Sequence, residues 1–227
     1  MIKIIALILF FTLSTFSQTD SSEQTLYTLF DKTVGASNTD ISYGAIHTEK
    51  YKSLDNDHQY FKSKQFYLGK INYQQQTFFN VSVKYNVAQD ALLVRIDNQT
   101  IVLESNLVSN FTLHNCHFIN HSILGYVAVI SDVKPLQFYK KHNKNKVKKL
   151  NESYIYYKFS DDNKYYLDYQ SKLFSVSSKK DIIKIFPTYK SDVKKFYKTN
   201  KSLLKKDLDQ FYKKLIILLD KEIKTPK

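Results

Sequence analysis

The sequence predicts an α+β protein that is mainly β. We expect an antiparallel sheet, either a sandwich or an open half-barrel, followed by two or three C-terminal helices packed on it. Between about residues 65 and 177, short runs of β-branched and aromatic residues alternate with polar turns, as in sheet proteins with hairpin connections. After Ser178 the apolar residues recur at helical spacing instead.

About ten strands are expected, and the clearest is "QTFFNVSVKYNV", which follows a polar turn at residues 74–76. Its residues alternate between two faces: Phe78, Asn80, Ser82 and Lys84 on one, and Phe79, Val81, Val83 and Tyr85 on the other. A hairpin is expected around Asn98-Gln99. Residues 140–153 are predicted to be a basic connection or hairpin tip, and Asp161–Asn163 a turn within a meander.

The helical part begins at a capping box formed by Ser178 and Asp181, and its first helix ends at Pro187. The longest helix is predicted over residues 202–223, with Ser202 as its cap. It has one apolar stripe, which we expect to face the sheet; contact with a membrane surface or a partner is the alternative. The stripe consists of Leu204, Leu208, Phe211, Leu215, Leu218 and Leu219.

The N-terminus "MIKIIALILFFTLSTFSQ" has the pattern of a secretory signal peptide: a lysine, a short apolar run and small residues before a cut after Ser17. We therefore expect an exported protein without a transmembrane segment, in the periplasm, at the periplasmic face of the outer membrane or outside the cell. The predicted organisation is residues 1–17 signal peptide, 18–64 N-terminal arm and loops, 65–177 antiparallel β domain, and 178–227 basic helical segment of the same globular unit.

Charge is distributed unevenly along the chain. Residues 134–227 contain 25 basic and 10 acidic residues, whereas residues 1–133 contain 9 and 11. Such asymmetry indicates an anionic partner, for example anionic lipid or lipopolysaccharide, unless the lysines form only a solvated surface. The candidate contacts are Lys205, Lys206, Lys213 and Lys214 on the longest predicted helix. Nucleic acid is not expected, because the protein is exported and Arg95 is its one arginine.

The stretch "LHNCHFINHS" holds the weak candidates for metal or thiol chemistry: His114, Cys116, His117 and His121. Read as one strand, it places His114 and Cys116 on one face and His117 and His121 on the other. Each face then has two donors, fewer than a zinc site needs. Neither a metal site nor a disulfide within the chain is predicted, since Cys116 is the single cysteine.

Other catalytic motifs are absent from the sequence. It has no Gly-x-Ser-x-Gly elbow, no glycine-rich phosphate loop and no His-Glu-x-x-His pair. The loop with Asp55, Asp57 and His58 lacks the glycine and the distal glutamate of a calcium-binding EF-hand loop. We therefore predict no catalytic residue and no cofactor.

Several phrases resemble a family of exported proteins from Bacteroidota, flavobacteria in particular, for which no activity is known. They are "LFDKTVGASN", "YGAIHTEKY", "NDHQYF", "FYLGKINY", "NVSVKYNVAQD", "IFPTYKSDVKKFY" and "KKDLDQFYKKL", in this order from about Leu26 to Leu219. The chain departs from the pattern at Gln75, where a glycine is common, and at Asn86, where an aspartate is common. The resemblance implies a compartment and a class of organism, and no activity.

The function expected from the sequence is therefore a non-enzymatic binding or accessory role in the cell envelope. Its ligand would be apolar or anionic, or its partner an envelope protein. Two alternatives stay open: a metal-dependent or thiol enzyme centred on His114 and Cys116, and an interaction protein without a small-molecule ligand. The oligomeric state is not predicted.

Overall fold

The structure is a computed structural model that describes residues 25–29, 33, 35, 38–54 and 56–225. The predicted signal peptide and Asp55 lie outside these residues. Within them, no helix has both the length and the apolar character needed to cross a bilayer.

The main element is one antiparallel sheet of eleven strands, followed along the chain by helices, which confirms the predicted fold class. Its strand order is β1-β5-β4-β3-β2-β6-β7-β8-β9-β12-β13, so β1 and β13 are its two edges and the sheet is open. The strands are β1 Ala45–Ile46, β2 Tyr67–Tyr73, β3 Gln76–Asn86, β4 Ala91–Ile96, β5 Gln99–Val102, β6 Val108–Leu113, β7 Cys116–His121, β8 Gly125–Val133, β9 Leu136–Lys141, β12 Lys164–Tyr169 and β13 Lys172–Val176.

A bulge in β3 reverses the predicted faces of its first half. Asn80 has a positive φ of 55°, which interrupts the alternation between Phe78 and Val83. Phe78 was predicted to share a face with Lys84, but it is buried in the core together with Val83 and Tyr85. The alternation holds from Val81 onward and is wrong before Asn80, because the bulge inserts one extra residue.

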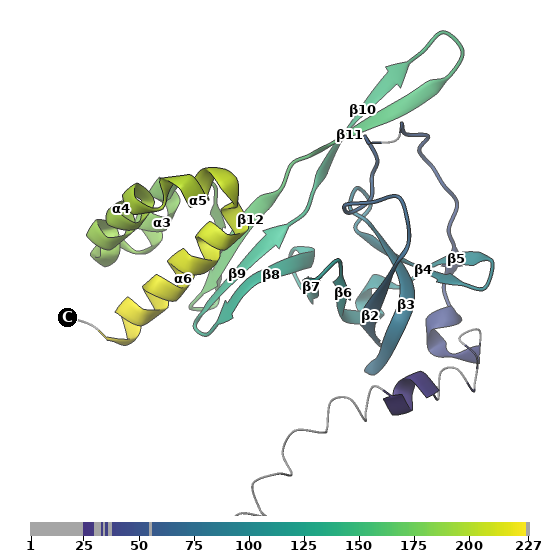
Figure 1. Cartoon of the computed structure of the whole chain (residues 1–227), viewed down its shortest axis with the longest axis horizontal. Helices are drawn as coiled ribbons and strands as arrows, with labels where there is room; N and C mark the ends of the chain where they lie inside the picture. The colour runs from purple at the N-terminus through teal and green to yellow at the C-terminus, as the bar shows by residue number, and fades with distance from the viewer. Residues whose placement is uncertain (1–24, 30–32, 34, 36–37, 55, 226–227) are drawn as a thin grey trace, which may run out of the picture.

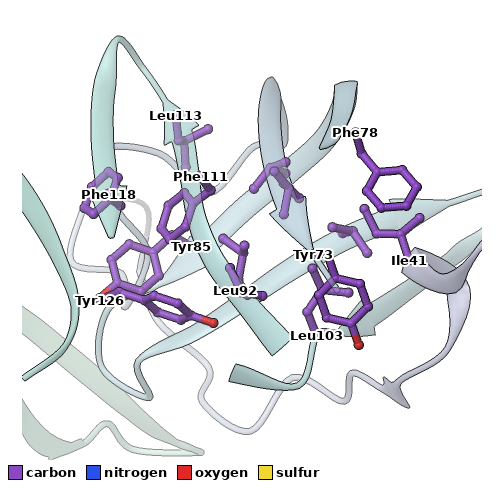
Figure 2. Close-up of a cluster of buried hydrophobic side chains, with 14 of the residues drawn as sticks. Ile41, Tyr73, Phe78, Tyr85, Leu92, Leu103, Phe111, Leu113, Phe118 and Tyr126 are labelled. Atoms are coloured by element: carbon purple, nitrogen blue, oxygen red, sulfur yellow. The ribbon is translucent and has the colours of Figure 1, made fainter. Parts of the chain in front are cut away.

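The sheet curls around its own aromatic core. Tyr85 on β3 lies 5.8 Å from Tyr126 on β8, although three strands separate β3 from β8 in the sheet. Phe111 and Phe118 stack at 4.6 Å between them. Figure 2 shows these four rings gathered at one end of the cluster. Because the rings fill the concave side, this part of the sheet is a packed core.

The C-terminal helices are α3 Lys179–Ile185, α4 Lys190–Thr199, α5 Lys201–Lys206 and α6 Leu208–Lys224. The capping box is present, since Asp181 accepts the backbone N–H of Ser178 at 2.8 Å. The single helix predicted over residues 202–223 is wrong. It divides at Asp207, whose extended backbone ends α5 and whose side chain accepts the N–H of Gln210 to cap α6.

The helices form a second core with the far part of the sheet. Phe138 on β9 and Tyr165 on β12 contact Tyr212 on α6, with ring centroids 4.8 and 4.9 Å apart. The predicted stripe of α6 faces this core: Phe211, Leu215 and Leu219 are fully buried. Lys140 of β9 pairs with Ala128 of β8 on one side and with Tyr165 of β12 on the other, so these side chains lie on the same face of the sheet. Because Ala128 belongs to the first core, the helices pack on the face that carries the first core.

A long hairpin extends from the sheet (Figure 1). After β9 the chain continues into β10 Lys144–Leu150, reverses, and returns through β11 Ile155–Asp161 into β12. The turn predicted at Asp161–Asn163 is wrong, because β11 pairs with β10 and β12 pairs with β9. Residues 162–163 join β11 to β12 without a reversal of the chain. The chain reverses instead at Asn151–Tyr154, between β10 and β11.

Candidate anionic-surface interface

The most prominent polar surface is the two-stranded ribbon β10–β11, which projects beyond the main sheet and away from the helices (Figure 1). Its register runs from Lys144 opposite Asp161 to Leu150 opposite Ile155, a length of about 20 Å at 3.3 Å per residue. Residues 144–161 contain five lysines and two acidic residues. The ribbon therefore carries net positive charge away from the body of the protein.

The lysines differ in what they contact. At the base, Lys144 lies 3.3 Å from Asp161, and midway along the ribbon Lys158 lies 3.6 Å from Asp57. Toward the tip, Lys148 and Lys149 are exposed, and no carboxylate of the described residues lies within ion-pair distance of either. The lysines at the base and middle of the ribbon are thus paired with carboxylates, and the two near the tip have no ion-pair partner among the described residues.

Residues 51–54 and 56–57 hold the ribbon along the outer edge of β11, and we name them the strap. Its carbonyls accept backbone hydrogen bonds from β11: the N–H of Tyr157 donates to Lys52 at 2.8 Å and that of Phe159 to Asp57 at 3.2 Å. The ring of Tyr51 contacts that of Tyr157 at 5.0 Å. The strap therefore fixes the direction of a ribbon that has no other sheet partner among the described residues.

Lys146 joins the strap to β10. Its Nζ donates to the Tyr51 hydroxyl at 3.0 Å and lies 4.1 Å from the centre of the same ring. The hydrogen bond and the charge of Lys146 lower the pKa of Tyr51. Lys146 thus helps to attach the ribbon to the strap and also contributes to the positive charge of the ribbon.

The tip of the ribbon is apolar and exposed. Leu150 is 80 % exposed, and Tyr154 and Ile155 are also exposed. Val147, which is exposed as well, lies midway along the ribbon opposite Lys158. The loop between Leu150 and Ile155 closes through a hydrogen bond of 3.0 Å from the N–H of Asn151 to the carbonyl of Tyr154. Exposed apolar residues next to unpaired lysines are typical of protein surfaces that contact membranes or partners.

The helix lysines predicted to contact an anionic surface are exposed as well. Lys205 and Lys206 end α5, and Lys213 and Lys214 lie on the outer side of α6. Within the described residues none of the four is in an ion pair. The hairpin and the helices lie at separate places in the fold (Figure 1), so their exposed lysines form two separate basic surfaces. The sequence indicated the lysines of the helices as candidate contacts with an anionic surface, and the structure adds the lysines of the hairpin.

The structure divides the stretch "LHNCHFINHS" differently from the prediction. His114 and Asn115, with φ of 51° and 60°, form a two-residue turn between β6 and β7, so His114 is not on a strand. Its ring lies 4.1 Å from that of Tyr67, and burial lowers its pKa. The Sγ of Cys116 is 3.8 Å from the Nζ of Lys62.

The other two histidines of this stretch lie apart from the first. His117 is exposed, and the Nδ1 of His121 accepts the N–H of Ile123 at 3.2 Å. Across the described residues, no three His, Cys, Asp or Glu side chains converge in a way that could hold a metal ion. His58, the neighbour of Asp57 in the acidic loop, is buried, and its Nδ1 accepts the N–H of Tyr60.

A polar cluster that the sequence did not indicate joins Glu49, Gln59 and Tyr60 to Lys84 of β3. Glu49 accepts hydrogen bonds from the Tyr60 hydroxyl and from the side-chain amide of Gln59. The Nζ of Lys84 lies 4.0 Å from the centre of the Tyr60 ring, and burial lowers the pKa of this lysine. No sequence spacing links these residues. Because their polar atoms are directed at one another, the cluster is organised as a structural network.

One depression of about 500 Å³ lies beside β3 and β4, lined by Phe79, Asn80, Ser82 and Arg95 among others. Thr28, Gly35 and Thr39 also line it. The packed rings of the core leave the concave side of the sheet filled. The geometry consequently favours recognition at the outer surface over a ligand held inside the sheet.

Comparison with known proteins gives no further guide to this surface. No family model matches the sequence, and neither the curated proteins nor the solved structures contain a match.

Proposed function

We propose that this chain is a non-enzymatic exported protein of the cell envelope that binds an anionic surface through the hairpin β10–β11. The observation that carries the proposal is the ribbon itself. It projects from the fold, is held by the strap, and presents Lys148 and Lys149 unpaired within the described residues. A rigid basic projection concentrates positive potential where a flat anionic partner can reach it.

The location in the envelope rests on the signal-peptide pattern of residues 1–17. The lysines of α5 and α6 supply a second basic surface, which we expect to add long-range attraction. Since exposed charges are screened over about 10 Å at 0.1 M salt, binding should weaken steeply as salt is raised.

Sedimentation with vesicles tests this proposal. The mature chain should sediment with phosphatidylglycerol vesicles at low salt and stay in solution with phosphatidylcholine vesicles. Replacing Lys148 and Lys149 by glutamine should weaken binding roughly 30-fold, at about 1 kcal/mol for each lysine near the surface. The helix variant K213Q/K214Q should weaken it less, because those lysines lie on the body of the protein.

The double variant K194Q/K195Q on α4 is the matched control, since it removes the same charge from another exposed position. Equal losses in the hairpin and control variants would mean that only net charge matters, and the hairpin would lose its assigned role. Absence of sedimentation with any anionic vesicle, lipopolysaccharide included, would refute the proposal.

A further inference from the structure

We propose that the anionic partner is a lipid bilayer and that the apolar tip of the hairpin enters its interfacial layer. The inserting side chains are Leu150, Tyr154 and Ile155. This inference rests on the proposed function and specifies the chemistry of its partner.

The tip combines the two features that interfacial insertion requires. Leu150 and Ile155 are paired directly across the ribbon, so they lie on the same face at its end. Two residues behind Leu150, the unpaired Lys148 is placed to reach phosphate groups while the apolar side chains enter. A soluble polyanion would use the lysines alone and would leave Leu150 in water.

Charge decides against a second copy of this chain as the occupant. Residues 146–158 contain four lysines and one acidic residue, so two tips brought together would repel each other. Glu152 lies in the terminal loop between Asn151 and Ser153. An anionic side chain at that position favours shallow insertion, with the loop at the level of the headgroups and the apolar pair beside it.

The absence of tryptophan from the chain provides a direct test, because one introduced tryptophan reports on its own surroundings. Leu150→Trp should shift its emission to shorter wavelength on phosphatidylglycerol vesicles and be quenched by lipids brominated in the acyl chain. The matched control is Ile123→Trp, in the turn between β7 and β8, where the native side chain is 74 % exposed. Its emission should not change.

Binding is measured by sedimentation in the same samples, which separates the two proposals. Vesicle binding with unchanged Leu150→Trp emission would overturn insertion and leave the proposed function standing. Loss of sedimentation itself would remove both. A blue shift that grows with protein concentration in the absence of vesicles would overturn the bilayer assignment in favour of self-association.

Substitution by serine gives an independent measurement. Leu150→Ser and Ile155→Ser should each weaken vesicle binding about tenfold, whereas Ile123→Ser should leave it unchanged. Because all three native side chains are exposed, none of these variants should affect folding. Equal affinity of Leu150→Ser and wild type would contradict insertion.

Discussion

At the scale of single residues, the most constrained position outside the proposed interface is the start of β8. Asp90 accepts a hydrogen bond of 2.6 Å from the Tyr85 hydroxyl and forms an ion pair of 2.8 Å with Lys141. Lys141 also donates to the carbonyl of Tyr126. These contacts join β3, β8 and β9 where the sheet curls, and they depend on close approach of the chain at Gly125.

Replacing Gly125 by alanine should destabilise the protein by about 2–4 kcal/mol. Gly125 has a φ of 69°, and a Cβ there would lie 2.1 Å from the Oδ2 of Asp90. The left-handed conformation costs an alanine about 1–2 kcal/mol, and disturbing the ion pair with Lys141 adds to this. Urea unfolding measures the effect, with exposed Ser122→Ala in the same turn as the control, expected within about 0.5 kcal/mol of wild type. A tolerated Gly125→Ala would contradict this account.

The limits of sequence reasoning are also clearest at single residues. Asn80 and His114 both have positive φ and both reverse a predicted pattern, one by a bulge and one by a turn. Strand periodicity identifies a strand, but a single left-handed residue inside an apolar run leaves no periodic signal. This is why β3 was predicted as a strand with Phe78 on the wrong face.

At the scale of elements, the order of strands and helices was predictable and a basic connection or hairpin tip was expected over residues 140–153, whereas the strand β10 was not expected there. Residues 144–150 have polar side chains on both faces, so the period of two that reveals a half-buried strand is missing. The break at Asp207 was missed for a related reason. The apolar stripe continues across it from Leu204 to Leu208, and only the backbone shows that two helices share the stripe.

The strap attaches the hairpin to the rest of the fold, and the variant Tyr51→Ala tests this role. Loss of the ring removes its contacts with Tyr157 and Phe159 and the hydrogen bond from Lys146. Amide hydrogen exchange should become faster throughout β10 and β11, while protection of β2–β8 stays as in wild type. Tyr51→Phe should have an intermediate effect, because it keeps the ring contacts.

Tyr43→Ala is the matched control for the strap, since it removes an exposed ring from the same N-terminal region. Its hairpin amides should exchange at the wild-type rate. Unchanged exchange in Tyr51→Ala would mean that the backbone bonds to Lys52 and Asp57 hold the ribbon without the ring.

At the scale of the whole molecule, the two cores meet at a partly buried polar junction. Lys140 lies 2.9 Å from Asp209 of α6, which also accepts the Tyr165 hydroxyl at 2.5 Å. Next to this junction the ring of His142 lies 4.7 Å from Phe61 of the first core. Because His142 contacts Phe61 and Phe118 of the first core, its charge state should affect the packing there.

The stability of the protein should therefore decrease as the pH falls from about 6.5 toward 4. Burial lowers the pKa of His142 to about 4, with a further decrease from Lys140 that Asp209, Asp161 and Asn163 partly oppose. Below pH 6.5 the unfolded chain binds a proton that the native state does not, which lowers the free energy of unfolding by up to about 1.4 kcal/mol per pH unit. The pKa values of His47, His58 and His114 are lowered as well, so their contributions have the same sign.

Urea unfolding of wild type and His142→Gln between pH 7 and pH 5 isolates the contribution of His142, since most carboxylates titrate below this range and the other histidines are common to both proteins. Wild type should lose about 2 kcal/mol through this residue alone. His142→Gln cannot titrate, so its stability should vary less with pH by that amount, whatever its absolute value at pH 7. His117→Gln, which replaces the exposed histidine of β7, should retain the wild-type slope. If the His142→Gln slope equals that of wild type, the acid sensitivity arises elsewhere and His142 is not the group that links the junction to pH.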